Sequence, residues 1–265
     1  MTSKIGIPEI IDALGLPPEA RVDARVPKKL LVEQGAPTAA DKRAIQDGID
    51  ELQWLAACKP TTIGVPGFVD DTRDYLEIAV VACAFRPDPE GKPAKAARLI
   101  ELIHRAIPYP VLLITSDEQG VALSAAHKRR AEREAGKMVI EGVVSVQGVG
   151  QRIGEAAADE IERAFLNSLA LAQQPRRDLC TLYEGWLARI EALNAARLNG
   201  AFAASDEPEA IQRRRDALEA HSRLTREIAS LRAKATREKQ LNRRVDLNLE
   251  IQRLEAEIAV LKNNL

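Results

Sequence analysis

Hydrophobic and polar residues are spaced in one pattern in the first half of the chain and in another pattern in the second half. Before Asp117, short runs rich in Val, Ile and Ala alternate with turn residues, and 12 of the 14 prolines lie there. After Gly154 only two glycines remain, and apolar residues recur every three or four positions. Short β-branched runs predict strands, whereas the later spacing predicts amphipathic helices. We therefore expect an α+β or α/β domain with a small mixed sheet and flanking helices, followed by an all-helical region that ends in a coiled coil.

The first domain is expected to span residues 1–150 and to contain several strands. Three segments have strand character: "TTIGV" (61–65), "YLEIAVVACAFR" (75–86) and "YPVLLIT" (109–115). "KPAKAARLIELIHRAI" (92–107) separates the last two and has helical spacing. This order predicts a strand–helix–strand unit with a parallel crossover.

Three further segments complete the predicted domain. Residues 37–59 predict one helix with Thr38 as N-cap. Its apolar residues fall at helical spacing, namely Ile45, Ile49, Leu52 and Leu55. Residues 120–136 predict a strand that passes into a turn or a basic helix. "KMVIEGVVSVQGV" (137–149) predicts another strand that closes the domain.

The second half divides into a helical connector over residues 151–204 and a final element over 205–265. Ser205 or Asp206 is the expected N-cap of the final element. Nothing beyond it forces a helix to end, although a turn near residues 233–238 remains open. The final element is therefore either one long helix or a helical hairpin.

A heptad repeat occupies the last 19 residues. Apolar positions there alternate in spacings of four and three, as in the seam of a coiled coil. The seam consists of Leu247, Ile251, Leu254, Ile258, Leu261 and Leu265. An earlier seam consists of Leu224, Ile228 and Leu231. Leu231 and Leu247 lie 16 residues apart, two more than two heptads, so the helix is discontinuous or turns back on itself between them.

The segment between the two seams, "TREKQLNRRVDLNLEI", places amides and arginines where apolar residues would continue the repeat. These residues are Gln240, Asn242, Arg243, Arg244 and Asn248. Three readings stay open: an exposed linker, a recognition surface, or a buried asparagine that fixes helix register. Between residues 211 and 244 the chain has 11 Lys and Arg against 4 Asp and Glu. This local excess of positive charge suits phosphates or an acidic partner.

Composition narrows the class of protein. The chain has 265 residues, 46% hydrophobic but only 3% aromatic, 29% charged, and a formal net charge of −1, so it has no overall attraction to nucleic acid or acidic membranes. Its three cysteines lie far apart and outside any C-x-x-C pair, which predicts reduced thiols and no zinc site. No signal peptide and no membrane span are expected, so the prediction is a cytoplasmic protein that needs no cofactor or metal.

One acidic cluster raises the alternative of a divergent magnesium-dependent nuclease. "VDDTRDYLEIAVV" places Asp74 in a turn and Glu77 at the start of a strand. Such sites pair carboxylates that hold Mg²⁺ with a lysine that helps to activate water. The position two residues after Glu77 is Ala79, so Lys59 would have to supply the lysine from elsewhere. Acidic residues in loops also act simply as turn formers.

Positive residues in the first half form three groups. "VPKKLL" contains Lys28 and Lys29, "DKRAI" contains Lys42, and "AHKRR" contains Lys128 and Arg129. Loops at the carboxyl ends of parallel strands could gather them into one cleft that binds anions. The alternative is a set of separate surface cations that aid solubility.

Several segments together resemble one bacterial family, the domain of unknown function numbered 4391. They include "VPKKLLVEQG", "YLEIAVVACAFR", "LIHRAIPYPVLLIT", "ALSAAHKRR" and "REKQLNRRVDLNLEIQRLEAEI". The resemblance covers nearly the whole chain and implies no activity. It implies the following family-pattern positions: Lys28, Lys29, Trp54, Lys59, Glu77, Pro108, Lys128, Gln240, Asn242 and Asn248. Members of the family are commonly encoded beside helicases and DNA methyltransferases in phage-defence or restriction-like islands.

Clean terminal heptads, no catalytic signature and this genomic company point to a non-catalytic accessory or scaffold subunit. We expect it to dock a helicase or a DNA methyltransferase of the same system, with the coiled coil serving docking or self-association. Contact with DNA or RNA through Lys and Arg is a further expectation. The alternatives are the divergent nuclease and a stand-alone nucleic-acid-binding module.

Overall fold

The computed structural model describes residues 5–87, 93–132, 134, 136–150, 156–262 and 265. The chain forms two compact units, Met1–Ile190 and Glu191–Leu265, and each is described here by itself. The division falls within helix α7 (Leu179–Asn199). The predicted connector would begin at residues 151–155, which lie outside the described part of the chain.

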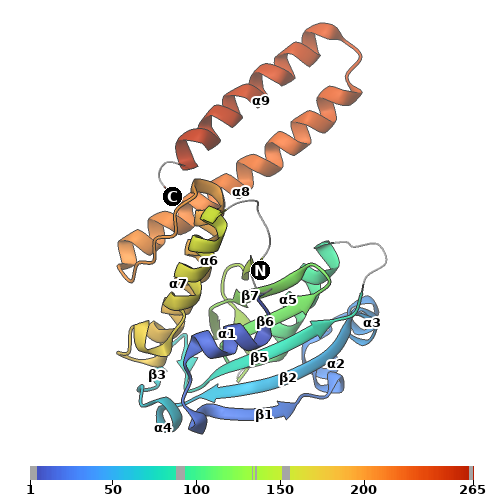
Figure 1. Ribbon diagram of the computed structural model, residues 1–265. Coiled ribbons are helices and arrows are strands. Elements are labelled where there is room, and N and C mark those ends of the chain that lie inside the picture. Colours follow the sequence, from blue (N-terminus) through green and yellow to red (C-terminus); the bar gives the residue numbers. More distant parts are fainter. Residues whose placement is uncertain (1–4, 88–92, 133, 135, 151–155, 263–264) are drawn as a thin grey trace. The chain divides into compact units, whose positions relative to one another are not determined.

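A six-stranded mixed sheet forms the centre of the first unit, in the order β1-β2-β5-β6-β7-β10 (Figure 1). Neighbouring strands are antiparallel except β5 and β6, which are parallel and are joined by helix α5 (Pro93–Ala106). The predicted mixed sheet and its parallel crossover are therefore confirmed. The strands are β1 (Arg21–Arg25), β2 (Ile49–Cys58), β5 (Ile78–Phe85), β6 (Val111–Asp117), β7 (Gly120–Ala125) and β10 (Ser145–Val149).

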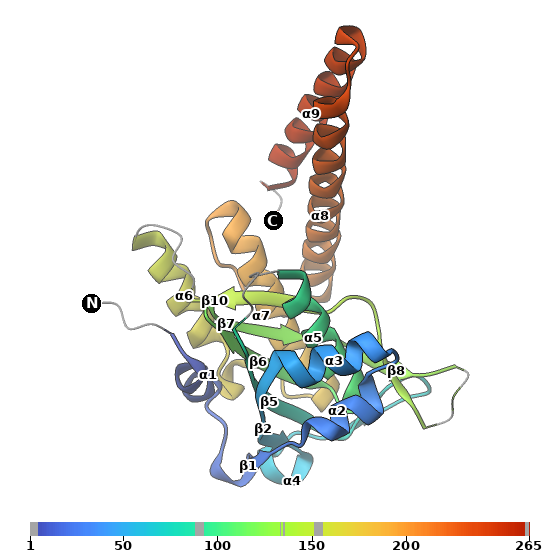
Figure 2. The ribbon, with the colours of Figure 1, turned by 90° about the vertical axis from the view of Figure 1, so that its right-hand side faces the viewer.

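Helices cover both faces of this sheet. Figure 2 shows α2 (Lys28–Gly35), α3 (Ala39–Gly48) and α5 on one side, with α1 (Ile7–Leu14) and α6 (Ala156–Ser168) on the other. The central strands are buried on both faces and read as continuous apolar runs, as expected between two helical layers.

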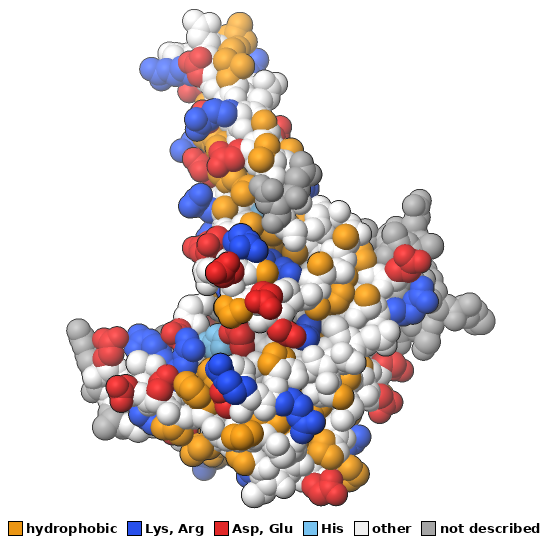
Figure 3. Space-filling view, turned by 90° about the vertical axis from the view of Figure 1, so that its left-hand side faces the viewer, with side chains coloured by type: hydrophobic (Ala, Val, Ile, Leu, Met, Phe, Trp, Pro, Cys, Tyr) orange, Lys and Arg blue, Asp and Glu red, His pale blue; other side chains and the backbone are white. Residues whose placement is uncertain are grey.

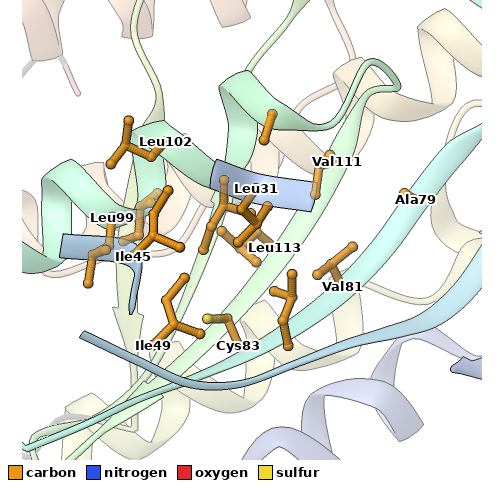
Figure 4. Close-up of a cluster of buried hydrophobic side chains, with 14 residues drawn as sticks. Leu31, Ile45, Ile49, Ala79, Val81, Cys83, Leu99, Leu102, Val111 and Leu113 are labelled. Atoms are coloured by element: carbon orange, nitrogen blue, oxygen red, sulfur yellow. The ribbon is translucent and has the colours of Figure 1, made fainter. Parts of the chain in front are cut away.

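The main core lies between the sheet and α2, α3 and α5 (Figure 4). Ala79, Val81 and Cys83 alternate into it from β5, because side chains along a strand point to opposite faces in turn. Leu31 and Ile45 reach it from α2 and α3, and both are at most 1% exposed. Ile49 and Leu52 anchor the first half of β2 in this core, and the predicted site residue Lys59 directly follows the end of the strand.

The prediction of one helix over residues 37–59 is wrong in its second half. Thr38 does cap α3, accepting the Asp41 N–H at 3.1 Å, but the helix ends at Gly48 and β2 begins at Ile49. Two irregularities in the pairing of β2 with β5 shift the strand's phase. Each irregularity adds one residue to β2, so neighbouring residues on the same side of the sheet lie three positions apart there and not two. The buried Ile49 and Leu52 have this spacing, which is also typical of a helix.

Three other predictions need correction in this unit. Residues 61–65 do not form a strand, because Pro60 opens a short helix, α4 (Pro60–Ile63), and Gly64 closes it with φ of 65°. After β7, where a turn or a basic helix is expected, the chain forms β8 (Lys128–Arg130), which pairs with β9 (Met138–Ile140). Residues 137–149 are therefore not one strand, because β9 pairs with β8 and β10 belongs to the main sheet. The remaining elements are β3 (Phe68–Val69), β4 (Asp74–Tyr75) and 3₁₀ helices at Pro18–Ala20 and Leu171–Gln173.

The second unit contains a helical hairpin of α8 (Pro208–Arg237) and α9 (Leu241–Lys262) (Figure 1). Helix α8 follows Glu207, so the expected caps Ser205 and Asp206 lie just before its start. The two-residue mismatch between the seams falls at the turn between the helices. The two seams pack on each other within one chain: Leu224, Ile228 and Leu231 of α8 meet Ile251, Leu254, Ile258 and Leu261 of α9.

Candidate functional site

The proposed nuclease residues are only partly brought together. Lys59 follows β2 and Glu77 precedes β5, and these strands are antiparallel neighbours. The Lys59 Nζ therefore lies 3.0 Å from the Glu77 Oε2. Glu77 is 8% exposed, and its other oxygen, Oε1, is buried without a hydrogen-bond partner.

Asp74 does not join this pair. On β4 it lies 3.6 Å from the Arg130 Nη2. The neighbouring Asp70 acts as a turn former, since its carboxylate accepts the backbone N–H groups of Thr72 and Arg73 at 2.7 and 2.6 Å. These two donors hold the pKa of Asp70 below its usual range. Within the described residues, no three His, Cys, Asp or Glu side chains form a group suited to a metal ion.

Lys28 and Lys59 lie at opposite ends of β2. The Lys28 ammonium donates to the carbonyl of Ile49, the first residue of this strand, whereas Lys59 directly follows its last residue. Ten residues at about 3.3 Å each place the two ends roughly 30 Å apart. A single cleft therefore does not contain both lysines.

Lys128 is a buried cation and not a surface one. Its side chain is 1% exposed, and its ammonium donates to the carbonyls of His104, at 2.5 Å, and Ile107. These carbonyls close α5, where the helix dipole favours positive charge. Burial nevertheless lowers the pKa of Lys128 to about 7. In this position Lys128 serves the end of α5 and does not face a ligand.

The other first-half cations are dispersed. Lys29 lies 3.6 Å from Glu33 on the same helix, and Arg129 lies 3.2 Å from Glu132. Lys42 is exposed on α3. Binding of an anion by these residues stays a prediction, and the contacts above favour the alternative of separate surface cations.

The hairpin turn gathers a different set of positive charges. Five exposed cations, called the tip cations below, lie on the last turns of α8, the turn itself and the first turn of α9: Lys234, Arg237, Lys239, Arg243 and Arg244. Figure 3 shows Lys and Arg side chains interspersed with hydrophobic ones along this hairpin. A shallow hollow of about 550 Å³ lies at the tip, lined by Lys234, Arg237, Glu238, Arg243, Asp246 and Leu247.

Little negative charge opposes the tip cations. The acids nearest in sequence are Glu238 and Asp246, and Glu238 is occupied in accepting the Gln240 backbone N–H at 2.8 Å. The hairpin's ion pairs within the described residues, such as Arg232 with Glu255 at 2.5 Å, leave the tip cations out. Unneutralised guanidinium groups in one place form a surface that attracts anions.

The amides of this segment stand in solvent. Gln240, Asn242 and Asn248 are all exposed, so the reading in which a buried asparagine fixes the helix register is wrong. An exposed amide offers both a donor and an acceptor to a binding partner. The exposed-linker and recognition-surface readings both remain compatible with this placement.

The first unit contains a buried polar chain that no sequence pattern indicated. The hydroxyl of Tyr75 lies 2.7 Å from the His127 Nδ1, and the His127 Nε2 contacts the Glu184 carboxylate. The Tyr75 oxygen also accepts the Lys128 backbone N–H at 3.1 Å. Both ring nitrogens of His127 are thereby engaged. The chain joins β4, the β7–β8 connection and α7.

The neighbouring Tyr183 strengthens the same junction. Its hydroxyl accepts the Ala126 N–H at 2.9 Å and donates to the Val111 carbonyl at 2.7 Å. Tyr75 and Tyr183 are both fully buried. These groups hold α7 against the sheet, and their sequence separations of more than 50 residues left no local signal.

Comparison with known proteins gives one match. The model of the family described as domain of unknown function (DUF4391) matches residues 14–258. No curated protein and no solved structure matches the chain. In the described part of the chain, every helix is too short or too polar to cross a lipid bilayer.

Proposed function

We propose that this chain, which belongs to the DUF4391 family, is a non-catalytic accessory subunit that contacts nucleic acid through the tip of its helical hairpin. Its expected setting is the restriction-like or phage-defence system implied by the family resemblance. There it would dock a helicase or a DNA methyltransferase and hold it on DNA or RNA.

The tip cations are the observation that supports this role. Five exposed Lys and Arg side chains surround one turn, and acidic side chains do not pair with them in the ion pairs of the described hairpin. Arginine is well suited to phosphate, because its planar guanidinium donates two parallel hydrogen bonds. Phosphate contacts are independent of sequence, which suits a subunit that positions an enzyme whose own site reads the bases.

The test compares two variants that lose equal charge from the same hairpin. The tip variant is Arg237→Ala/Arg243→Ala/Arg244→Ala. The control is Arg213→Ala/Arg223→Ala/Arg226→Ala, three exposed arginines on α8 away from the tip. Fluorescence anisotropy would measure binding to labelled single-stranded DNA, duplex DNA and RNA at several salt concentrations.

We expect the tip variant to bind at least about 10-fold more weakly, and its salt slope to fall by roughly 2 to 3, since each lost phosphate contact removes about 0.9. The control should lose less than about 3-fold. Equal loss in both variants would assign binding to general charge, and unchanged binding by the tip variant would refute the site. Co-purification with the neighbouring helicase or methyltransferase tests the docking role separately.

A magnesium-dependent nuclease is the second candidate, because the Lys59–Glu77 contact places a lysine on a buried carboxylate with one unpartnered oxygen. Its third residue, Asp74, pairs with Arg130 instead. Incubation of plasmid with the protein and Mg²⁺ or Mn²⁺ tests it. Cleavage that disappears in Glu77→Ala would support the nuclease; equal or no cleavage would end it.

A further inference from the structure

Helix α9 carries apolar residues on two opposite faces, and only one face is covered by α8. The covered face is the seam that includes Ile251 and Leu254, at 7% and 3% exposure. The second face, called the outer stripe below, stays in solvent. It consists of Leu241, Val245, Leu249 and Val260, at 64%, 48%, 58% and 63% exposure.

The outer stripe runs along the helix with one polar interruption, because Gln252 and Arg253 occupy this face between Leu249 and Ala256. Leu241, Val245 and Leu249 follow at intervals of four, and the same face continues through Ala256 to Val260. At 100° per residue, its centre lies almost opposite the seam. A helix that stays half in water normally has one apolar face, so the outer stripe indicates a second packing surface.

The order of charges along α9 identifies a fitting partner. The helix carries Arg243, Arg244, Asp246 and Glu250 in its first half and Arg253, Glu255, Glu257 and Lys262 in its second half, so neither half has a net charge. Two copies of α9 packed in parallel would place like charges side by side. Two antiparallel copies would instead bring Asp246 of each helix beside Arg253 of the other, which favours association.

We propose that the outer stripe is the contact between two copies of this chain, with their α9 helices antiparallel about a two-fold axis near Glu250 and Ile251. In this register Leu241 packs on Val260 of the partner subunit, and Val245 packs on Ala256 of the partner subunit. Each contact occurs twice, as in any isologous interface. The seam with α8 stays intact, so the intramolecular hairpin and the dimer use different faces.

Charged residues flank the stripe in matching positions. Asp246 and Arg253 lie on the same side of it, and in the antiparallel register Asp246 comes within reach of Arg253 of the partner subunit. Arg253 now contacts Glu250 at 2.9 Å on the exposed surface, where exchange of partners costs little. The symmetric pair of such contacts sets the register.

The size of the surface sets the expected strength. The stripe from Leu241 to Val260 spans about 28 Å of one helix, which buries less than the roughly 800 Å² per partner of a standard interface. We therefore expect dissociation constants in the micromolar range. The inference goes beyond the proposed function and does not rest on nucleic-acid binding.

The first experiment measures mass against concentration by sedimentation velocity, from about 1 to about 200 µM. The full chain should change from monomer to dimer across this range. Val245→Lys/Leu249→Lys should stay monomeric, whereas Ser222→Lys/Ala229→Lys, with two lysines on the outer face of α8, should dimerise like the parent. Far-ultraviolet circular dichroism verifies that all three keep their helices. A parent that remains monomeric throughout overturns the proposal.

The second experiment tests the register. Asp246→Arg and Arg253→Glu each place like charges together twice in a homodimer, so each alone should dimerise at least about 10-fold more weakly. Mixed together, they should form a heterodimer of restored affinity, because each contact then joins opposite charges. An intramolecular effect on the helix would not be restored by mixing. Absence of restoration would overturn the antiparallel register.

Discussion

The two units of this chain differ in how completely they bury their hydrophobic residues. In the sheet unit, three helices and three strands share one core whose members are mostly below 2% exposed, such as Leu102 and Leu113. In the hairpin, the core is a single seam with four buried residues, and four other large apolar residues of α9 stay in solvent. Buried polar groups occur in both units: the sheet unit encloses His104, His127 and Lys128, and the second unit encloses Glu191 and Arg214.

This difference separates stability from recognition. A core covered on both faces opens only with global unfolding, whereas a thin seam between two helices opens locally at lower cost. Surfaces that bind other molecules need exposed groups, and the hairpin supplies apolar residues, cations and amides together. The sheet unit is therefore expected to carry the stability of the chain, and the hairpin its contacts.

The largest effect is expected from truncating one leucine in each core. Leu113→Ala in β6, at 0% exposure, should lower the free energy of unfolding by about 3 to 5 kcal/mol, because it removes contacts on all sides and leaves a cavity. Leu254→Ala in the seam should cost about 2 kcal/mol and act locally. Urea unfolding measures the first and hydrogen exchange along α8 and α9 the second. If Leu254→Ala also lowered the protection of sheet amides from hydrogen exchange, the two units would not differ in stability as proposed.

The next effect concerns the buried charge of the sheet unit. Lys128 has a pKa of about 7 in the folded protein against an ordinary value of 10.5. Between pH 7 and pH 10.5 the unfolded chain binds more protons than the folded protein, so the free energy of unfolding of the parent rises with pH. The loss of stability from burying a charged Lys128 is greatest below about pH 7. Lys128→Met removes this linkage. The difference in unfolding free energy between parent and variant should change by up to about 1.4 kcal/mol per pH unit between about pH 7 and 10.

Urea unfolding of both proteins between about pH 6 and 9.5 measures this difference. The comparison cancels the titration of cysteines and tyrosines, which both proteins share. A matched control is Lys234→Met, which removes an exposed lysine from the hairpin by the same substitution. Parallel curves for parent and Lys128→Met would show that Lys128 stays charged, with water reaching its ammonium.

Local sequence patterns predicted the elements whose spacing of apolar residues is not changed by pairing with distant strands. The run Ile78–Phe85 and the helix after it gave the parallel crossover, since a strand buried on both faces is continuously apolar. The 16-residue interval between Leu231 and Leu247 predicted a discontinuity, and the turn of the hairpin lies there. In each case the information lies in one uninterrupted stretch of sequence.

Other features depend on distant partners and were missed or misassigned. The two irregularities of β2 give a strand the spacing of a helix, and only pairing with β5 shows which it is. In "AHKRR", Lys128 resembles a surface cation because its acceptors, the carbonyls that close α5, lie more than 20 residues earlier. The outer stripe was hidden by the stronger heptad signal on the opposite face of α9.

A smaller effect is expected at the start of α3. Thr38 accepts the Asp41 N–H and donates to the Asp41 carboxylate at 2.7 Å, and the same carboxylate binds Arg98 through two hydrogen bonds of 2.8 and 3.0 Å. Thr38→Ala should cost about 1 kcal/mol, because it leaves a helix N–H without its acceptor. Thr38→Ser keeps the hydroxyl and should retain most of the free energy of unfolding that Thr38→Ala loses. Thermal unfolding measures both, and equal losses would show that the methyl group matters more than the cap.

The smallest effect is expected for the ion pair that links the two helices of the hairpin. Arg232 and Glu255 approach to 2.5 Å, but their side chains are 65% and 45% exposed, so water and salt screen the attraction. A double-mutant cycle with Arg232→Ala and Glu255→Ala should give a coupling below about 0.5 kcal/mol that vanishes in high salt. A coupling well above 1 kcal/mol that persists in salt would mean that this surface is shielded from water, as it would be if another molecule covered the hairpin. The coupling energy between Arg232 and Glu255 therefore indicates whether this surface of the hairpin is exposed to solvent.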